Sequence, residues 1–121
     1  MVTVDAIHRL LAYVAILFIA AGIGWSVLLA FAGRAGGAAF ERFQAAVVSL
    51  LIVGGASGAI LLATGARPAD GLHLLYAAIA LAVVPLARSF TGRLSGRGTA
   101  ALLLAAFVVL GAVLYRLLTT G

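Results

Sequence analysis

The chain has no cysteine, few charged residues and only two histidines among its 121 residues. Without cysteine it can form no disulfide, hold no metal through thiolates and carry no redox-active thiol. Charged residues make up 9% of the chain, whereas a typical soluble domain has about 25%. Because 65% of the residues are hydrophobic, folding in water would leave a large apolar surface exposed. The composition therefore indicates a protein of the lipid bilayer.

The few charges divide the sequence into four uncharged runs of 17 to 24 residues, at 10–33, 43–66, 71–87 and 98–115. A helix needs about 20 apolar residues to cross the hydrocarbon core of a membrane. The runs lack the alternation of a membrane strand, and they are too few to close a barrel. We therefore predict an all-α fold for the single domain 1–121. It is an integral membrane four-helix bundle with helices at about 6–31, 43–64, 71–88 and 99–118.

The net charge of +5 comes from arginine, and the arginines lie near the ends of the predicted helices. These positions indicate topology determinants rather than a nucleic-acid surface. One side of the membrane receives Arg34, Arg42, Arg88, Arg93 and Arg97, and the other receives Arg9, Arg67 and Arg116. The positive-inside rule makes the side with five arginines cytoplasmic. We expect a protein of a prokaryotic inner or cell membrane that contacts lipid and no nucleic acid, with both termini extracytoplasmic.

Two pairs of similar segments indicate an internal duplication. Residues 5–8 (Asp-Ala-Ile-His) and 70–73 (Asp-Gly-Leu-His) share the pattern Asp-x-(Ile/Leu)-His and open the first and third predicted helices. The second and fourth helices both end in Leu-Leu-x-Thr-Gly, at 61–65 and 117–121. This pattern predicts two similar hairpins in tandem, a two-plus-two parallel repeat related by a two-fold axis along the membrane normal.

The duplication places the two histidines, His8 and His73, at the same depth on parallel helices. A two-fold axis between these helices would turn their side chains toward each other. Helical spacing then puts small residues one and two turns deeper on the same faces, namely Ala12, Ala15, Ala77 and Ala80. A flat ring system would fit between such stripes of alanine.

This arrangement is what a haem b with two axial imidazoles would require. Neutral imidazole is the ligating form, and a helix N-terminus disfavours the imidazolium. Haem propionates need cations at the rim, and the predicted ones are Arg9, Arg67 and Arg116. Asp5 and Asp70 are predicted to cap their helices and so to fix the orientation of the imidazoles.

In helix number, size and this histidine pair, the chain resembles the four-helix b-type membrane cytochromes, in which histidines from different helices clamp haem. The resemblance assigns the axial role to His8 and His73 and implies a single haem, since only one histidine pair is present. It also implies electron exchange with quinol, a periplasmic partner or other subunits of a membrane complex. On this interpretation the protein carries electrons rather than turning over a substrate.

Two other interpretations remain open at this point. The chain is a cofactor-free accessory subunit of a membrane complex if the Asp-x-x-His copies are simply helix caps and the small residues serve helix packing. Alternatively, His8, His73, Asp5 and Asp70 hold a zinc or iron ion. The haem interpretation is preferred over the ion because both aspartates are already predicted as caps and the alanines leave more space than an ion needs.

Four aromatic residues lie toward the predicted cytoplasmic ends of the helices: Trp25, Phe40, Phe43 and Phe90. Aromatic side chains are enriched where a membrane meets water. We therefore predict that these four form an interfacial belt rather than a binding site.

Overall fold

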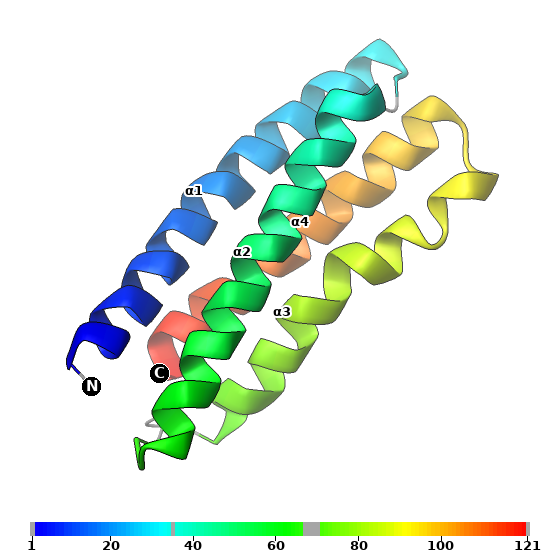
Figure 1. The fold of residues 1–121 in the computed structure, drawn as a ribbon. Helices are drawn as coiled ribbons and strands as arrows, with labels where there is room; N and C mark the ends of the chain where they lie inside the picture. The colour runs from blue at the N-terminus through cyan, green and yellow to red at the C-terminus, as the bar shows by residue number, and fades with distance from the viewer. Residues whose placement is uncertain (1, 35, 67–70, 121) are drawn as a thin grey trace.

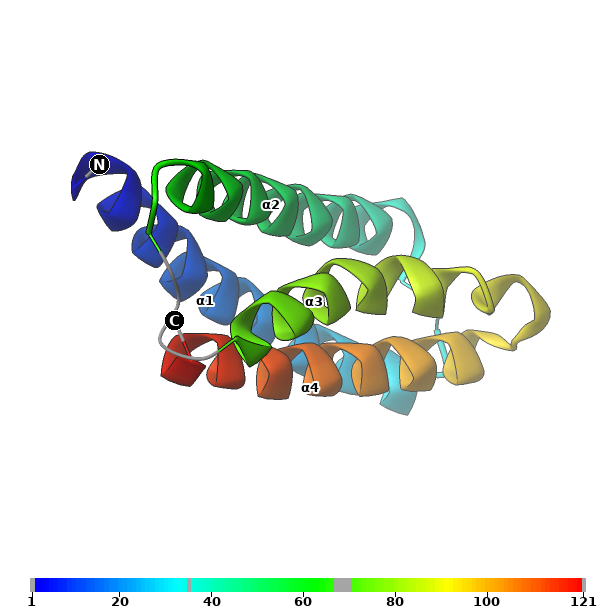
Figure 2. The same ribbon diagram turned by 90° about the horizontal axis from the view of Figure 1, so that it is seen from below.

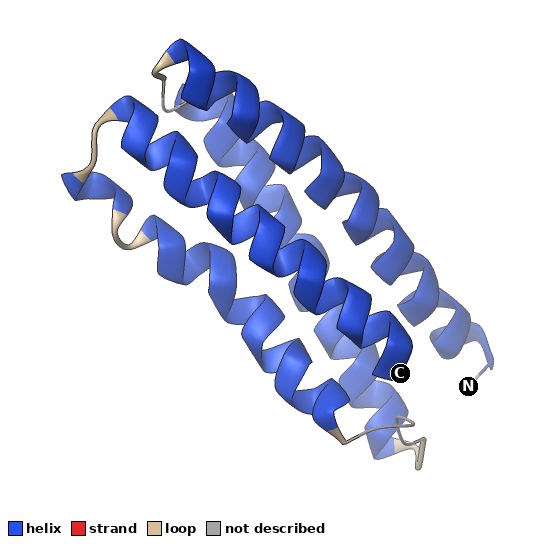
Figure 3. Ribbon diagram, turned by 180° about the vertical axis from the view of Figure 1, so that it is seen from behind, coloured by secondary structure: helices blue, strands red, loops and turns tan. Residues whose placement is uncertain are grey.

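The computed structural model describes residues 2–34, 36–66 and 71–120. Its helices are α1 (Val2–Ala32), α2 (Gly37–Ala63), α3 (Leu72–Arg88) and α4 (Gly96–Thr120), with a short 3-10 helix, η1 (Thr91–Arg93), before α4. The described residues contain no strand, as Figure 3 shows. The predicted all-α four-helix bundle is confirmed.

The four helices run alternately in opposite directions, so α1 and α3 begin at the same end of the bundle (Figure 1). The first helix packs against α2 and α4, and α3 packs closely against α4 but only sparsely against α2. Helices α1 and α3 therefore lie on one diagonal of the bundle, and α2 and α4 on the other (Figure 2). We call the end where α1 and α3 begin the histidine end, and the opposite end the loop end.

Helices α1, α2 and α4 begin earlier than predicted, whereas the end of α3 at Arg88 agrees with the prediction. Helix α2 begins at Gly37 rather than at about residue 43, because Gly36 (φ 95°) and Gly37 (φ 63°) turn the chain within very few residues. These positive φ angles are strained for any residue with a side chain. Helix α3 continues through Pro85 to Arg88, although proline cannot donate the helical hydrogen bond.

Three of the four helices are long and apolar enough to cross a membrane: Thr3–Ala32, Gly37–Ala63 and Gly96–Thr119. Large apolar side chains on the outside, such as Leu17, Leu28 and Phe31, suit contact with lipid. Helix α3 has 17 residues, which extend about 26 Å against a hydrocarbon core of about 30 Å. The length and apolar composition of these three helices indicate a membrane protein. That α3 also crosses the membrane, and the side on which the termini lie, stay predictions.

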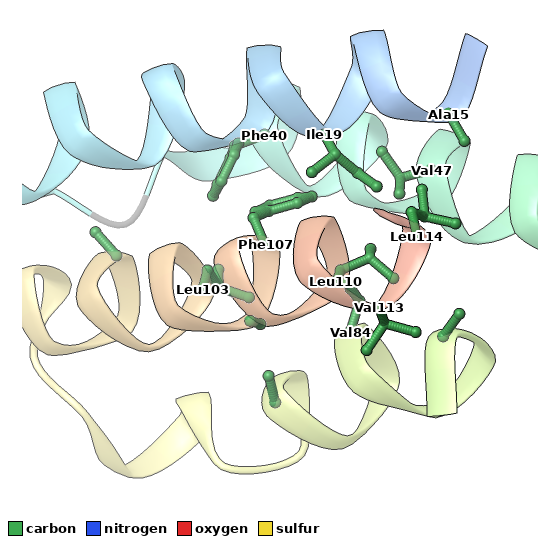
Figure 4. Close-up of a cluster of buried hydrophobic side chains, with 14 of the residues drawn as sticks. Ala15, Ile19, Phe40, Val47, Val84, Leu103, Phe107, Leu110, Val113 and Leu114 are labelled. Carbon is green, nitrogen blue, oxygen red and sulfur yellow. The ribbon is translucent and has the colours of Figure 1, made fainter. Parts of the chain in front are cut away.

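The bundle interior near the loop end contains an aromatic cluster. The ring centroids of Trp25 and Phe40 lie 5.0 Å apart, and those of Phe43 and Phe107 lie 6.1 Å apart. Both Phe40 and Phe107 are fully buried and point toward each other between the helices (Figure 4). The predicted interfacial belt is wrong for Phe40, because its ring is fully buried inside the bundle. Trp25 and Phe43 are half-buried beside it, and their place in a belt stays a prediction. Phe90 remains largely exposed.

The predicted tandem repeat stays a prediction. A strict two-fold axis along the bundle would make the contact between α2 and α3 equal to the contact between α1 and α4. In the structure the α1–α4 contact is the most extensive in the bundle, and the α2–α3 contact is the least extensive among neighbouring helices. The two hairpins are thus not packed equivalently.

Candidate functional site at the histidine end

The structure brings the two histidines together across the α1–α3 diagonal. The ring centroids of His8 and His73 lie 6.4 Å apart, with the ring planes inclined by 63°. Both side chains are half-buried. Helices α1 and α3 begin at the same end of the bundle (Figure 1). His8 near the start of α1 can therefore meet His73 near the start of α3.

Helix α2 holds the His8 ring through its Nδ1 atom. This nitrogen lies 3.1 Å from the backbone oxygen of Gly54 and 2.8 Å from Oγ of Ser57. A carbonyl oxygen can only accept a hydrogen bond, so Nδ1 must carry the hydrogen in this geometry. The Nε2 atom of His8 then keeps its lone pair and is the nitrogen free to bind a metal.

The local sequence of α2 explains how it reaches His8. Gly54, Ser57 and Gly58 are spaced three and four residues apart, so they share one face of the helix. Ser57 is buried, and its hydroxyl donates to the backbone oxygen of Gly54 at 2.7 Å. A Cβ atom on Gly58 would lie 3.1 Å from Cε1 of His8, so glycine lets the ring lie against the helix.

Gly54, Gly55, Gly58 and Gly111 were expected to widen the space beside the histidines, but sequence reasoning missed Ser57 and the hydrogen bonds that α2 makes with His8. A signal was present, because Ser57 is one of few polar residues in the apolar run 43–66 and has glycines on the same helical face. A buried serine needs a hydrogen-bond partner. The hydroxyl of Ser57 finds one partner within α2, at Gly54, and nothing in the sequence pairs residue 57 with residue 8.

Helix α4 supports His73 at the same end. The backbone carbonyl of Leu117 lies close to the His73 imidazole. Next to it in sequence, the Arg116 guanidinium lies 5.7 Å from the ring centroid of Tyr76, one turn after His73 on α3. Such a cation–π contact places the arginine charge at the histidine end of the bundle.

The three predicted propionate-binding arginines have different positions. Arg9 lies beside His8 in α1, is largely exposed, and its Nε is 3.2 Å from Oδ2 of Asp5. Arg116 is exposed near the end of α4. Arg67 falls outside the described residues, so its position relative to the histidines stays a prediction.

The predicted capping role of Asp5 is wrong. Helix α1 already begins at Val2, so Asp5 lies within its first turn and pairs with Arg9. The orientation of the His8 ring is set by Gly54 and Ser57 instead. Asp70, the second predicted cap, lies outside the described residues.

The predicted alanine stripes lie on the inner side of both helices. Ala12 and Ala77, one turn below the histidines, are half-buried. Two turns below, Ala15 and Ala80 are buried in the core. Leu114 of α4 is buried near Ala15 and helps to fill the interior at that depth (Figure 4). The space with the smallest side chains therefore lies immediately beneath the two imidazoles.

A metal-ion site built on carboxylates finds little support in the described part of the chain. No group of three or more His, Asp and Glu residues there is arranged to hold a metal ion. Asp5 is engaged by Arg9. The described residues thus offer two imidazoles as ligands and no third ligand beside them.

The fold and apolar surface define the class of protein as a helical bundle of the membrane. Comparison with known proteins adds no family, because no family model, no curated protein and no solved structure matches the chain. Its function must therefore be inferred from the geometry of the histidine end.

Proposed function

We propose that the protein is a small b-type membrane cytochrome that binds one haem between His8 and His73. The observation that carries this proposal is the 6.4 Å separation of the two ring centroids. A metal–imidazole nitrogen bond is about 2.0–2.1 Å long, so two imidazoles on opposite sides of one metal place their centroids about 6 Å apart. The spacing of the histidines thus fits axial ligation of a single iron.

The polar contacts of both rings also fit this role. Histidines that bind metals usually donate their other ring N–H to a carbonyl or carboxylate, which fixes the ring and its tautomer. His8 donates from Nδ1 to Gly54 and leaves Nε2 free. The carbonyl of Leu117 on α4 lies close to His73. The His8 imidazole is therefore held from the neighbouring helix in its hairpin, and the neighbouring helix of the other hairpin offers His73 a carbonyl in the same way.

The residues around the pair suit a flat group with acidic side arms. Ala12 and Ala77 are small residues one turn below the rings, whereas the buried residues two turns deeper close the interior. Arg9 and Arg116 lie at the same end and would hold the propionates, and Arg67 is proposed for the same task. Bound haem supplies a reversible one-electron iron couple.

Two axial histidines leave no coordination position open for oxygen or a substrate. The expected activity is therefore electron transfer rather than catalysis, close to the predicted extracytoplasmic face. The partner is another subunit of a membrane complex or quinol, because connections as short as that between α1 and α2 offer little surface to a soluble protein.

The test is a visible spectrum of the purified protein, oxidised and then reduced with dithionite. We expect a Soret band in the wild type and its loss in His8→Ala and in His73→Ala. Asp5→Asn is the matched control, because it changes an exposed residue on the same turn of α1 and leaves both imidazoles in place. Circular dichroism and gel filtration establish that each variant is folded.

A folded wild type that stays colourless after incubation with hemin would overturn the proposal. It would then favour a cofactor-free accessory subunit of a membrane complex. Metal analysis of the colourless protein would separate that case from an ion bound by the two histidines.

A further inference from the structure

A second candidate site lies at the loop end, on the other side of the aromatic cluster from the histidines. It is a cavity of about 650 Å³ between α2 and α3, with residues of α4 at its base. This volume is typical of small-molecule sites, which run from about 300 to 1,000 Å³. The cavity lies where the bundle is least tightly packed, because α2 and α3 make few contacts with each other.

The hydroxyl groups that line this cavity are already bonded to the protein. Three of them donate to backbone oxygens three or four positions earlier, over 2.6–2.8 Å, and that of Thr99 donates to the backbone oxygen of Thr91 over 3.4 Å. The three belong to Ser49, Ser89 and Thr91. Gln44 also lines the cavity but is 2% exposed, so it offers a bound molecule almost no surface. The hydroxyl groups therefore have no hydrogen left for a ligand.

The remaining polar side chains of the lining are one anion and one cation. Glu41 stands on α2 and Arg88 at the end of α3, so the two charges come from different walls of the cavity. Both residues are exposed, and neither forms an ion pair with the other or with another described residue. The space between them is complemented by a molecule that carries both an ammonium and a carboxylate.

The lining changes from charged to apolar with depth. Glu41 and Arg88 lie toward the loop end, whereas Val48 and Leu103 lie further toward the middle of the bundle. A fitting ligand thus presents both of its charges toward the loop end and an apolar group toward the middle. An α-amino acid has this connectivity, because its ammonium, its carboxylate and its side chain are separate arms close to one carbon.

We propose that this cavity binds an α-amino acid with a large apolar side chain, such as phenylalanine. The ammonium of the ligand donates to the carboxylate of Glu41, and the guanidinium of Arg88 donates to the carboxylate of the ligand. The side chain of the ligand packs against Val48 and Leu103. This site lies at the opposite end of the bundle from the histidines and does not depend on bound haem.

The experiment titrates ligands into the purified protein in detergent and follows binding by saturation-transfer difference NMR. Phenylalanine is compared with three analogues that each lack one recognised group. Phenylalaninol has a hydroxyl in place of the carboxylate, 3-phenylpropionate lacks the ammonium, and glycine lacks the side chain. We expect each analogue to bind at least about tenfold more weakly than phenylalanine, the effect of losing a hydrogen bond between charged groups or a buried apolar side chain.

The two charged residues are distinguished by variants. Arg88→Gln should weaken the binding of phenylalanine about tenfold but should not weaken that of phenylalaninol, which has no carboxylate for the guanidinium. Glu41→Gln should weaken phenylalanine to a similar extent but not 3-phenylpropionate, which has no ammonium. Arg42→Gln is the control, because Arg42 is the exposed neighbour of Glu41 and does not line the cavity. It should bind phenylalanine as the wild type does.

Three results would overturn the proposal: no saturable binding of phenylalanine at millimolar concentrations, equal binding of the analogues, or unchanged affinity in folded Glu41→Gln or Arg88→Gln. Both variants change exposed residues, so we expect them to fold, and circular dichroism checks this. Haem content plays no part in the measurement.

Discussion

The contact between α1 and α4 and the contact between α2 and α3 occupy opposite sides of the same bundle, yet they are built differently. The α1–α4 contact is extensive and the α2–α3 contact sparse. Both sides contain glycine, and both are largely apolar. What differs is which side chain faces each glycine and whether polar side chains lie between the helices.

On the tight side, glycines face large apolar side chains. A Cβ atom on Gly22 of α1 would lie 2.9 Å from the ring of Phe107 on α4, and one on Gly111 of α4 would lie 3.5 Å from Cγ2 of Ile19 on α1. Small residues that admit a neighbour's side chain are the main means of close packing inside a membrane. At the loop end, Arg97 of α4 donates a hydrogen bond from Nε to the backbone oxygen of Ala30 on α1 and so links the two helices.

On the loose side, between α2 and α3, the small and polar residues do not bring the two helices into close contact. A Cβ atom on Gly55 would lie 3.6 Å from Cδ1 of Leu81, which is an ordinary contact distance. Gly58 faces His8 of α1 instead of α3. The unsatisfied Gln44 and the cavity lie further along the same side. The comparison teaches that this bundle is packed tightly between α1 and α4 and loosely between α2 and α3.

The largest effect is expected from removing the ring of Phe107, which fills the tight contact between α1 and α4. Phe107→Ala is expected to lower the free energy of unfolding by about 2–4 kcal/mol, because a cavity replaces a ring that is fully buried. The loss should lie below that of the same change in a water-soluble core, since lipid tails solvate exposed apolar side chains. Unfolding of the detergent-solubilised protein by added SDS measures the effect.

Phe31→Ala is the matched control for this change, because Phe31 is 82% exposed. It should change the unfolding free energy little. An equal loss in the two variants would mean that the ring of Phe107 does not fill the α1–α4 contact.

A second change tests the glycine that receives this ring. Gly22→Ala should destabilise the protein by about 1–3 kcal/mol, the usual cost of overpacking, because the new methyl would meet the Phe107 ring at 2.9 Å. In Gly24→Ala, two residues or about half a turn further on in α1, the new Cβ has nothing within 4 Å. It should be neutral or stabilising by about 0.5–1 kcal/mol, since alanine favours helix. Thermal unfolding of the two variants in parallel reads out the difference, and a Gly22→Ala variant as stable as Gly24→Ala would contradict a tight α1–α4 contact.

The smallest effect is expected on the loose side. Gly55→Ala adds a methyl at ordinary contact distance from Leu81, so we expect no loss of stability and a gain of up to about 1 kcal/mol from helix propensity. The same thermal measurement, beside Gly22→Ala, compares the two sides directly. A loss as large as that of Gly22→Ala would show that the α2–α3 contact is as tightly closed as the α1–α4 contact.

Much of the fold followed from the one-dimensional pattern of the chain. The uncharged runs predicted four helices, and their lengths placed the helices in a membrane. The pairing of Asp5 with Arg9 is of the kind that spacing alone can predict, because residues four apart share a helical face. The sequence nevertheless suggested a cap for Asp5, because the start of α1 was placed four residues too late.

Only part of the candidate site could be predicted from the sequence. The repeated Asp-x-x-His pattern singled out His8 and His73, but the residues that hold the His8 ring, Gly54 and Ser57, lie more than 40 positions away. Likewise, Phe40 and Phe43 were predicted to form part of an interfacial belt. In the structure both rings contact the ring of Phe107 from α4. Such pairs depend on how helices rotate against each other, which periodicity does not specify.

The sequence by itself determined a helical membrane protein with a histidine near the start of two of its helices, because hydrophobic length and charge position act locally along the chain. Only the tertiary structure decided that α1 closes on α4 while α2 stands apart from α3, that Gln44 is buried without a donor, and that the two imidazoles face each other. The physical reason is that helices in lipid gain little from burying one apolar face rather than another. Their rotation and pairing are set by the fit of individual side chains, such as the Phe107 ring against Gly22.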